Sequence, residues 1–128
     1  MEPMARSIVA QYGLSGGILA TSVKDLSDSD AKTRSRAGSG PSIAWTIGHL
    51  CHFKVKMLQL LGRAKANPFA ALFEHAAATD GSNYPALAEL LASFSTLNSE
   101  LSAAVSTAPA AQLDAPMPGA GPHDEKKV

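Results

Sequence analysis

Apolar residues recur every three or four positions over three long stretches of the chain, which is the period of a helix with one buried face. The stretches cover about residues 4–26, 41–61 and 85–107. The last is the most regular, because steps of three and four alternate along it. Its apolar positions are Leu87, Leu90, Phe94, Leu97, Leu101, Ala104 and Ala108. This alternation is typical of helices that pack side by side in a bundle, so the pattern predicts three long helices.

Residues typical of helix ends flank the second stretch. Ser42 can serve as its N-cap, and Gly62 suits the left-handed backbone position just after its last turn. Before it, residues 25–40 contain many Ser, Asp, Arg and Gly residues, which are typical of a loop. The residues expected to form its buried stripe are Ile43, Ile47, Leu50, Met57 and Leu61.

A shorter helix is expected between the second and third stretches. Asn67 can cap it, Pro68 suits its first turn, and it would end near His75. Pro and Gly are frequent near the end of the chain. We therefore expect a helical domain over residues 1–114 and an extended or disordered tail over residues 115–128.

Together these elements predict an all-α, up-and-down helical bundle with three long helices and one short helix. The low aromatic fraction of 5% also favours helices over a β-sandwich or barrel. A length of 128 residues is enough for one domain with a single core. Four helices are the commoner solution for such lengths, and the chain ends where a fourth long helix would be expected.

Composition narrows the classes of partner. The formal net charge is zero, which gives no broad attraction to nucleic acid. No apolar run approaches the roughly 20 residues of a membrane span, and no apolar signal segment is visible near the first residue. Cys51 is the single cysteine, which excludes an internal disulfide and fits a reducing compartment. We expect a cytoplasmic protein that binds neither nucleic acid nor membranes.

One segment resembles a known family. Residues 41–50 read Pro-Ser-Ile-Ala-Trp-Thr-Ile-Gly-His-Leu, and this looks like the second-helix signature of the DinB-like superfamily, in which a Trp stands four residues before a His. Here these are Trp45 and His49. Further similar pieces follow in the family's order, at residues 8–18, 60–62, 72–73, 84–85 and 113–116.

The resemblance implies a four-helix bundle, often dimeric. Many members bind a divalent metal of the zinc, nickel or iron class with three histidines. One lies on the second helix and two, spaced His-x-x-x-His, lie on the last. His49 matches the first ligand. No His-x-x-x-His follows Thr107, where only His123 occurs, so the chain looks like a C-terminally shortened member that lacks two ligands.

The residues around His49 also have simpler interpretations. From the pattern alone, His49 is a hydrogen-bonded histidine on the inner face of its helix, beside Trp45 as a core anchor. His52 could be a second ligand one turn on, but we expect it to face outward or toward a partner. Cys51 is read as a small buried hydrophobe rather than a nucleophile.

Lys54 and Lys56 are read as ordinary surface charges. No catalytic residue is assigned, because no paired carboxylates lie on the expected inner faces.

Two functions follow. The first is a divalent-metal-binding bundle related to thiol-cofactor-dependent transferases, with its substrate and its status as an enzyme left open. The second is a non-catalytic bundle that has lost the metal site and self-associates. In that case the missing helix would expose part of the seam of Leu87, Leu90, Phe94, Leu97 and Leu101, which favours a homodimer or aggregation.

Overall fold

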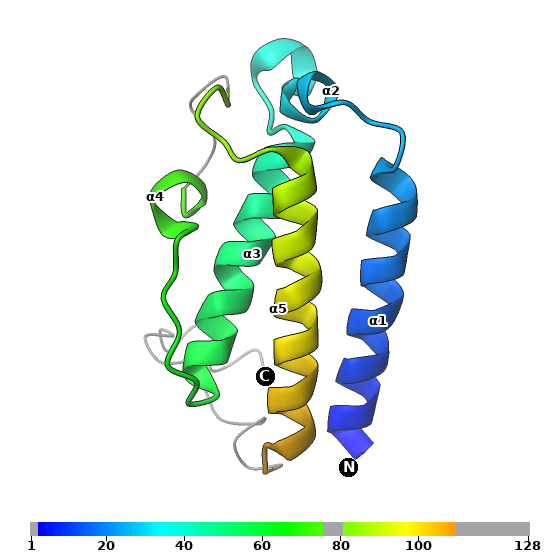
Figure 1. Ribbon diagram of the computed structural model, residues 1–128, viewed down its shortest axis with the longest axis vertical. Coiled ribbons are helices and arrows are strands. Elements are labelled where there is room, and N and C mark those ends of the chain that lie inside the picture. Colours follow the sequence, from blue (N-terminus) through cyan, green and yellow to red (C-terminus); the bar gives the residue numbers. More distant parts are fainter. Residues whose placement is uncertain (1–2, 76–80, 110–128) are drawn as a thin grey trace.

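The computed structural model describes residues 3–75 and 81–109, and over these ranges the chain is helical without strands (Figure 1). The elements in chain order are α1 (Pro3–Val23), α2 (Asp28–Lys32), the 3-10 turn η1 (Arg36–Gly38), α3 (Ile43–Leu60), α4 (Ala70–Phe73) and α5 (Leu87–Thr107). The predicted all-α bundle with three long helices is confirmed. The tail predicted over residues 115–128 lies outside the described residues.

The three long helices form a layer with α5 in the middle. Helix α5 packs against both α3 and α1, and these are the two most extensive helix pairs of the fold (Figure 1). Helices α3 and α5 run in the same direction and α1 runs opposite to both. Parallel neighbours need a long connection, which here contains α4 and packs beside α3.

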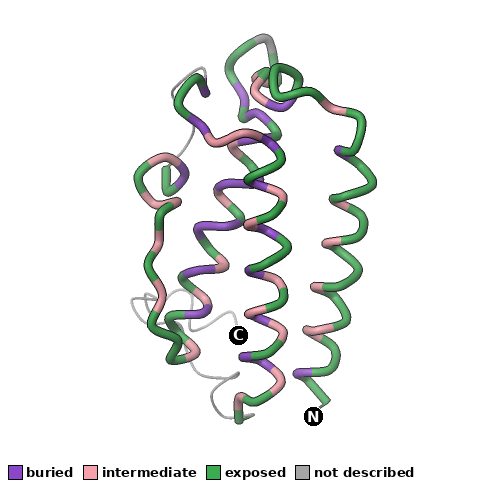
Figure 2. Tube along the Cα trace, in the orientation of Figure 1, coloured by how far each residue is buried: buried purple, intermediate pink, exposed green. Residues whose placement is uncertain are grey.

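The core lies between α3 and α5, where buried positions recur along both helices (Figure 2). The largest fully buried side chains are Phe73, Ile47, Leu58, Leu90, Leu101, Val55 and Cys51. The seam predicted on α5 is therefore confirmed as a buried seam. The expectation that a missing helix would expose it is wrong, since its five residues from Leu87 to Leu101 are at most 6% exposed.

The buried stripe predicted on α3 is partly wrong. Ile47 is buried, but Ile43 and Leu50 are 40% and 41% exposed. The residues that face α5 instead begin one position later, with Ala44, and continue through Cys51 and other small or branched side chains. Small residues allow α5 to approach closely, so the chain uses a narrower face than its largest apolar residues suggest.

The predicted helix limits hold where a side chain makes the cap. The Ser42 hydroxyl accepts the Trp45 N–H at 3.0 Å, and Gly62 has φ +86° just after α3. The loop predicted over residues 25–40 contains α2, which was missed. A capping box starts it, because Ser27 and Asp30 exchange side-chain and backbone hydrogen bonds.

An imidazole wedged between aromatic rings on α3

His49 is half-buried on the side of α3 that faces α4. Its Nδ1 lies 2.6 Å from the carbonyl oxygen of Phe73. A carbonyl only accepts hydrogen bonds, so Nδ1 carries a proton, and in the neutral ring Nε2 keeps its lone pair. The ring stacks on Trp45 at a centroid distance of 4.5 Å and meets the edge of Phe53 at 4.8 Å. Three contacts therefore fix both the tautomer and the plane of this imidazole.

The short helix α4 is held against α3 by the same residues. Trp45 lies one turn before His49 on α3 and donates its indole N–H to the carbonyl of His75 at 3.1 Å, beside the bond that His49 makes to Phe73. Phe73 is 1% exposed and lies directly over Gly48. A Cβ at position 48 would come within 2.5 Å of the Phe73 ring. Glycine is thus required for this close approach.

His52 is buried, so the expectation that it faces outward is wrong. It is 3% exposed and its Nδ1 lies 2.8 Å from the side-chain nitrogen of Asn67. The Asn67 amide oxygen already accepts the Phe69 N–H at 3.2 Å, so its nitrogen must donate to His52. Consequently Nδ1 of His52 is the acceptor, Nε2 carries the hydrogen, and this N–H has no partner among the described residues.

Among the described residues, no second free imidazole nitrogen lies beside Nε2 of His49 to help hold a metal. The rings of His49 and His52 are 6.5 Å apart, and the lone pair of His52 is taken by Asn67. His75 lies at the surface beside Glu74, and His123 lies outside the described residues. Within residues 3–75 and 81–109, no group of three or more His, Cys, Asp or Glu could hold a metal ion. The residues present therefore do not fit a complete three-histidine site.

Cys51 is inert in this setting, as expected for a buried hydrophobe. It is 0% exposed, and its Sγ lies 3.9 Å from the carbonyl oxygen of Leu90. Burial raises the pKa of its thiol to about 11, with a smaller opposing effect from Lys54. A thiol protonated at neutral pH is a poor nucleophile and a poor metal ligand.

Lys54 is not the ordinary surface charge that the sequence suggests. Its Nζ lies 4.8 Å from the ring centroid of Tyr12 on α1 and 4.7 Å from that of Phe94 on α5. Burial lowers the pKa of this amine. Among the described residues, only these two aromatic rings stabilise its charge, since no described carboxylate forms an ion pair with it. Lys56, two residues on, is exposed as expected.

Sequence reasoning missed two partners of the histidines. Asn67 was read only as a helix cap, and its bond to His52 across fifteen residues leaves no local signal. A side-chain pattern cannot predict a bond to the backbone carbonyl of Phe73, although Gly48 in mid-helix indicates a close neighbour.

The fold and this site define a class of protein: an all-α bundle with an aromatic-flanked histidine on its second long helix. The chain belongs to the DinB superfamily, whose sequence model matches residues 15–128. Among curated proteins nothing matches it, and no solved structure matches it either. None of the described helices is long and apolar enough to cross a bilayer.

Proposed function

We propose that this chain is a divalent-metal-binding DinB bundle in which His49 supplies one of several ligands. The observation that carries the proposal is the 2.6 Å contact between Nδ1 of His49 and the Phe73 carbonyl oxygen. Histidines that ligate metals commonly donate their second ring N–H to a backbone carbonyl, which orients the ring and raises its basicity. His49 has this arrangement, with Nε2 left as the ligating atom.

The remaining ligands would come from outside the described residues, either from a second copy of the chain or from His123. One neutral imidazole holds a divalent ion weakly, so tight binding requires those additional ligands. The proposal includes the relationship to thiol-cofactor-dependent transferases that the family resemblance implies. It assigns no reaction step, because the described residues do not make a complete site.

Elemental analysis and native mass spectrometry of the untagged protein, before and after a chelator, test this proposal. The informative variant is His49→Asn, because its amide N–H can replace the bond from Nδ1 to Phe73 while no ligand replaces Nε2. His75→Asn is the matched control at an exposed histidine. We expect zinc, nickel or iron in the wild type and in the control, and its loss in His49→Asn. Equal metal content in all three would refute the role of His49.

Self-association is a second candidate, favoured by the outer face of α1. Leu14 and Ile18 are 67% and 58% exposed and adjoin a shallow hollow of about 480 Å³. The hollow is lined by Gly13, Leu14, Gly17, Ile18, Thr21 and Ser22. This face is apolar and uncharged, so two copies can meet on it without opposing like charges, as a two-fold dimer requires.

Sedimentation velocity at tens of micromolar, an order-of-magnitude choice set by weak dimer affinities, tests the homodimer. Leu14→Glu should give a monomer, whereas Ala92→Glu adds the same charge at an exposed position of α5 and should not. A monomeric wild type would exclude this candidate, and it would leave the metal proposal standing.

A further inference from the structure

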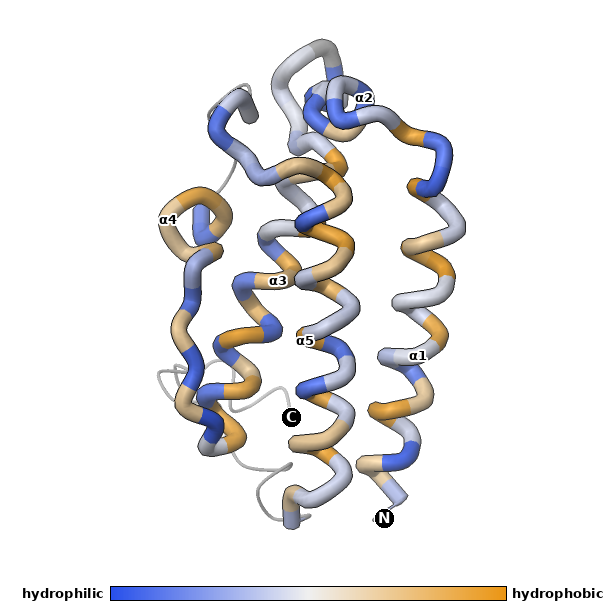
Figure 3. The backbone as a smooth tube through the Cα atoms, viewed as in Figure 1, coloured by the Kyte–Doolittle hydropathy of each residue, from blue (hydrophilic) through white to orange (hydrophobic). Residues whose placement is uncertain are grey.

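A cavity of about 620 Å³ lies between α1 and α5. The two helices run side by side in Figure 3, and α1 has only a few strongly hydrophilic turns. The cavity wall combines aromatic rings and small residues with a few polar groups, and it includes Tyr12, Gly16, Phe94, Asn98 and Ser102. Cavities of about 300–1,000 Å³ with mainly apolar walls and a few polar groups are typical of small-molecule sites. This cavity has that size and composition.

One cation lies beside the cavity without a carboxylate partner. The Nζ of Lys54 lies 4.8 Å from the ring centroid of Tyr12 and 4.7 Å from that of Phe94, and both rings belong to the cavity wall. A ligand group in contact with either ring is therefore within roughly 10 Å of Nζ, about the Debye length at 0.1 M ionic strength. Burial lowers the pKa of Lys54, and a nearby anion would favour its charged form again.

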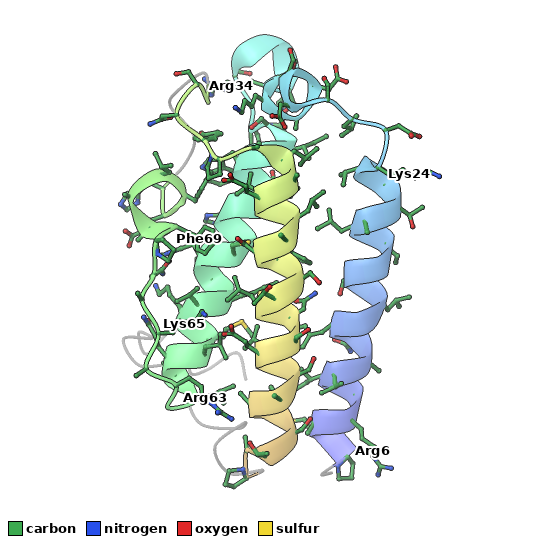
Figure 4. The ribbon with its side chains drawn as sticks, viewed as in Figure 1. Arg6, Lys24, Arg34, Arg63, Lys65 and Phe69 are labelled. Carbon is green, nitrogen blue, oxygen red and sulfur yellow. The ribbon has the colours of Figure 1, made fainter. Side chains whose placement is uncertain are left out.

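No other charge of the described residues lies in the cavity wall, which contains neither acidic nor basic side chains. Within α1 the charged residue is Arg6, one turn before the first residue of the wall. Figure 4 shows Arg6 near one end of α1 and Lys24 just past the other. On α5, Glu89 lies in the first turn, outside the wall, and Glu100 is already in an ion pair. The charge nearest the cavity is thus positive, which favours an anionic ligand over a cationic one.

Asn98 leaves a hydrogen-bond acceptor without a donor in the same wall. Its Nδ2 donates to the carbonyl oxygen of Tyr12 at 3.4 Å. Its Oδ1 is buried and has no hydrogen-bond partner among the described residues. Buried polar atoms are nearly always paired, so this oxygen indicates a donor that comes from outside the chain.

We propose that this cavity binds a small aromatic carboxylate that also carries a hydroxyl or N–H group. The ligand ring packs against Tyr12 and Phe94, and its carboxylate lies toward the ammonium group of Lys54. Its hydroxyl or N–H group donates to Oδ1 of Asn98, whose amide turns toward the cavity that it lines. The inference requires neither a metal at His49 nor a second copy of the chain.

Saturation-transfer NMR and isothermal titration calorimetry on the full chain test the proposal. The probe is 4-hydroxyphenylacetate. Tyramine keeps its ring and hydroxyl group but carries an ammonium group in place of the carboxylate, and 4-methoxyphenylacetate lacks the donor. We expect the probe to bind about tenfold more tightly than tyramine, as one charge-assisted contact would give. It should also bind more tightly than 4-methoxyphenylacetate, and its advantage over tyramine should shrink at high salt.

Three variants locate the binding. Lys54→Met keeps an unbranched apolar side chain without the charge, and it should abolish the preference for the probe over tyramine. Lys56→Met is the matched control at an exposed lysine of the same helix and should keep that preference. Asn98→Leu, similar in size, should abolish only the preference over 4-methoxyphenylacetate. Far-UV circular dichroism checks that each variant folds.

Three results would overturn the proposal: no binding of 4-hydroxyphenylacetate, equal binding of the probe and tyramine, or an equal loss of preference in Lys54→Met and Lys56→Met. The last would assign the preference to net charge alone. His49→Asn should bind the probe as the wild type does, so this proposal and the metal proposal can fail separately.

Discussion

The docking of α4 depends on the absence of a side chain at Gly48, and Gly48→Ala tests this directly. The new Cβ would lie 2.5 Å from two atoms of the Phe73 ring and 2.6 Å from a third. Carbon atoms in good contact are about 3.5–4.0 Å apart, so the ring must retreat by about 1 Å. Phe73 is 1% exposed, and its backbone carbonyl is bonded to His49, so it has little room to do so.

The magnitude follows from two opposing effects. Overpacking of this kind costs about 1–3 kcal/mol, while replacing Gly by Ala inside a helix returns about 1 kcal/mol. The free energy of unfolding should therefore fall by about 1 kcal/mol. Gly17→Ala is the matched control, because a Cβ there meets nothing within 4 Å and only the helix gain of up to about 1 kcal/mol applies.

Urea unfolding followed by far-UV circular dichroism compares the two variants. Gly48→Ala should lower the free energy of unfolding and Gly17→Ala should raise it, so the two variants should differ by about 2 kcal/mol. This corresponds to about 1 M in the urea midpoint for a slope of roughly 2 kcal/mol/M. Trp45 is the single tryptophan and is bonded to the end of α4, so its emission should shift in Gly48→Ala only. A Gly48→Ala protein as stable as Gly17→Ala, with unchanged emission, would refute this account of α4.

Three further outcomes are expected. Asn67→Ala should lower the free energy of unfolding by about 1–3 kcal/mol in urea titrations, since it leaves the buried Nδ1 of His52 without a donor; an unchanged midpoint would contradict this. Cys51 should react with a maleimide far more slowly in the native protein at pH 8 than in urea, because the pKa of its thiol is about 11 and its side chain is buried; equal rates would contradict it. Burial lowers the pKa of Lys54, so the unfolded chain binds this proton more tightly and stability gains a contribution as pH rises toward the unfolded pKa near 10.5; Lys54→Met should remove that gain between pH 8 and 10, and an unchanged pH dependence would show that Lys54 is not its source.

Local patterns predicted the helices because each long helix forms its backbone hydrogen bonds within itself and needs only one apolar face to pack. The Ser42 cap and the buried seam of α5 were readable for that reason. The capping box of α2 was also readable in Ser27 and Asp30, but it was obscured by the surrounding polar residues.

Which face of α3 is buried could not be read from its pattern, because large apolar residues also lie on its exposed side. The larger residues, Ile43 and Leu50, suggested a stripe that is partly exposed in the fold, which instead buries Ala44 and Cys51 against α5. The choice depends on how closely α5 can approach, which is a property of the pair of helices. The burial of His52 is a tertiary effect of the same kind, since Asn67 reaches it from the connection that follows α3.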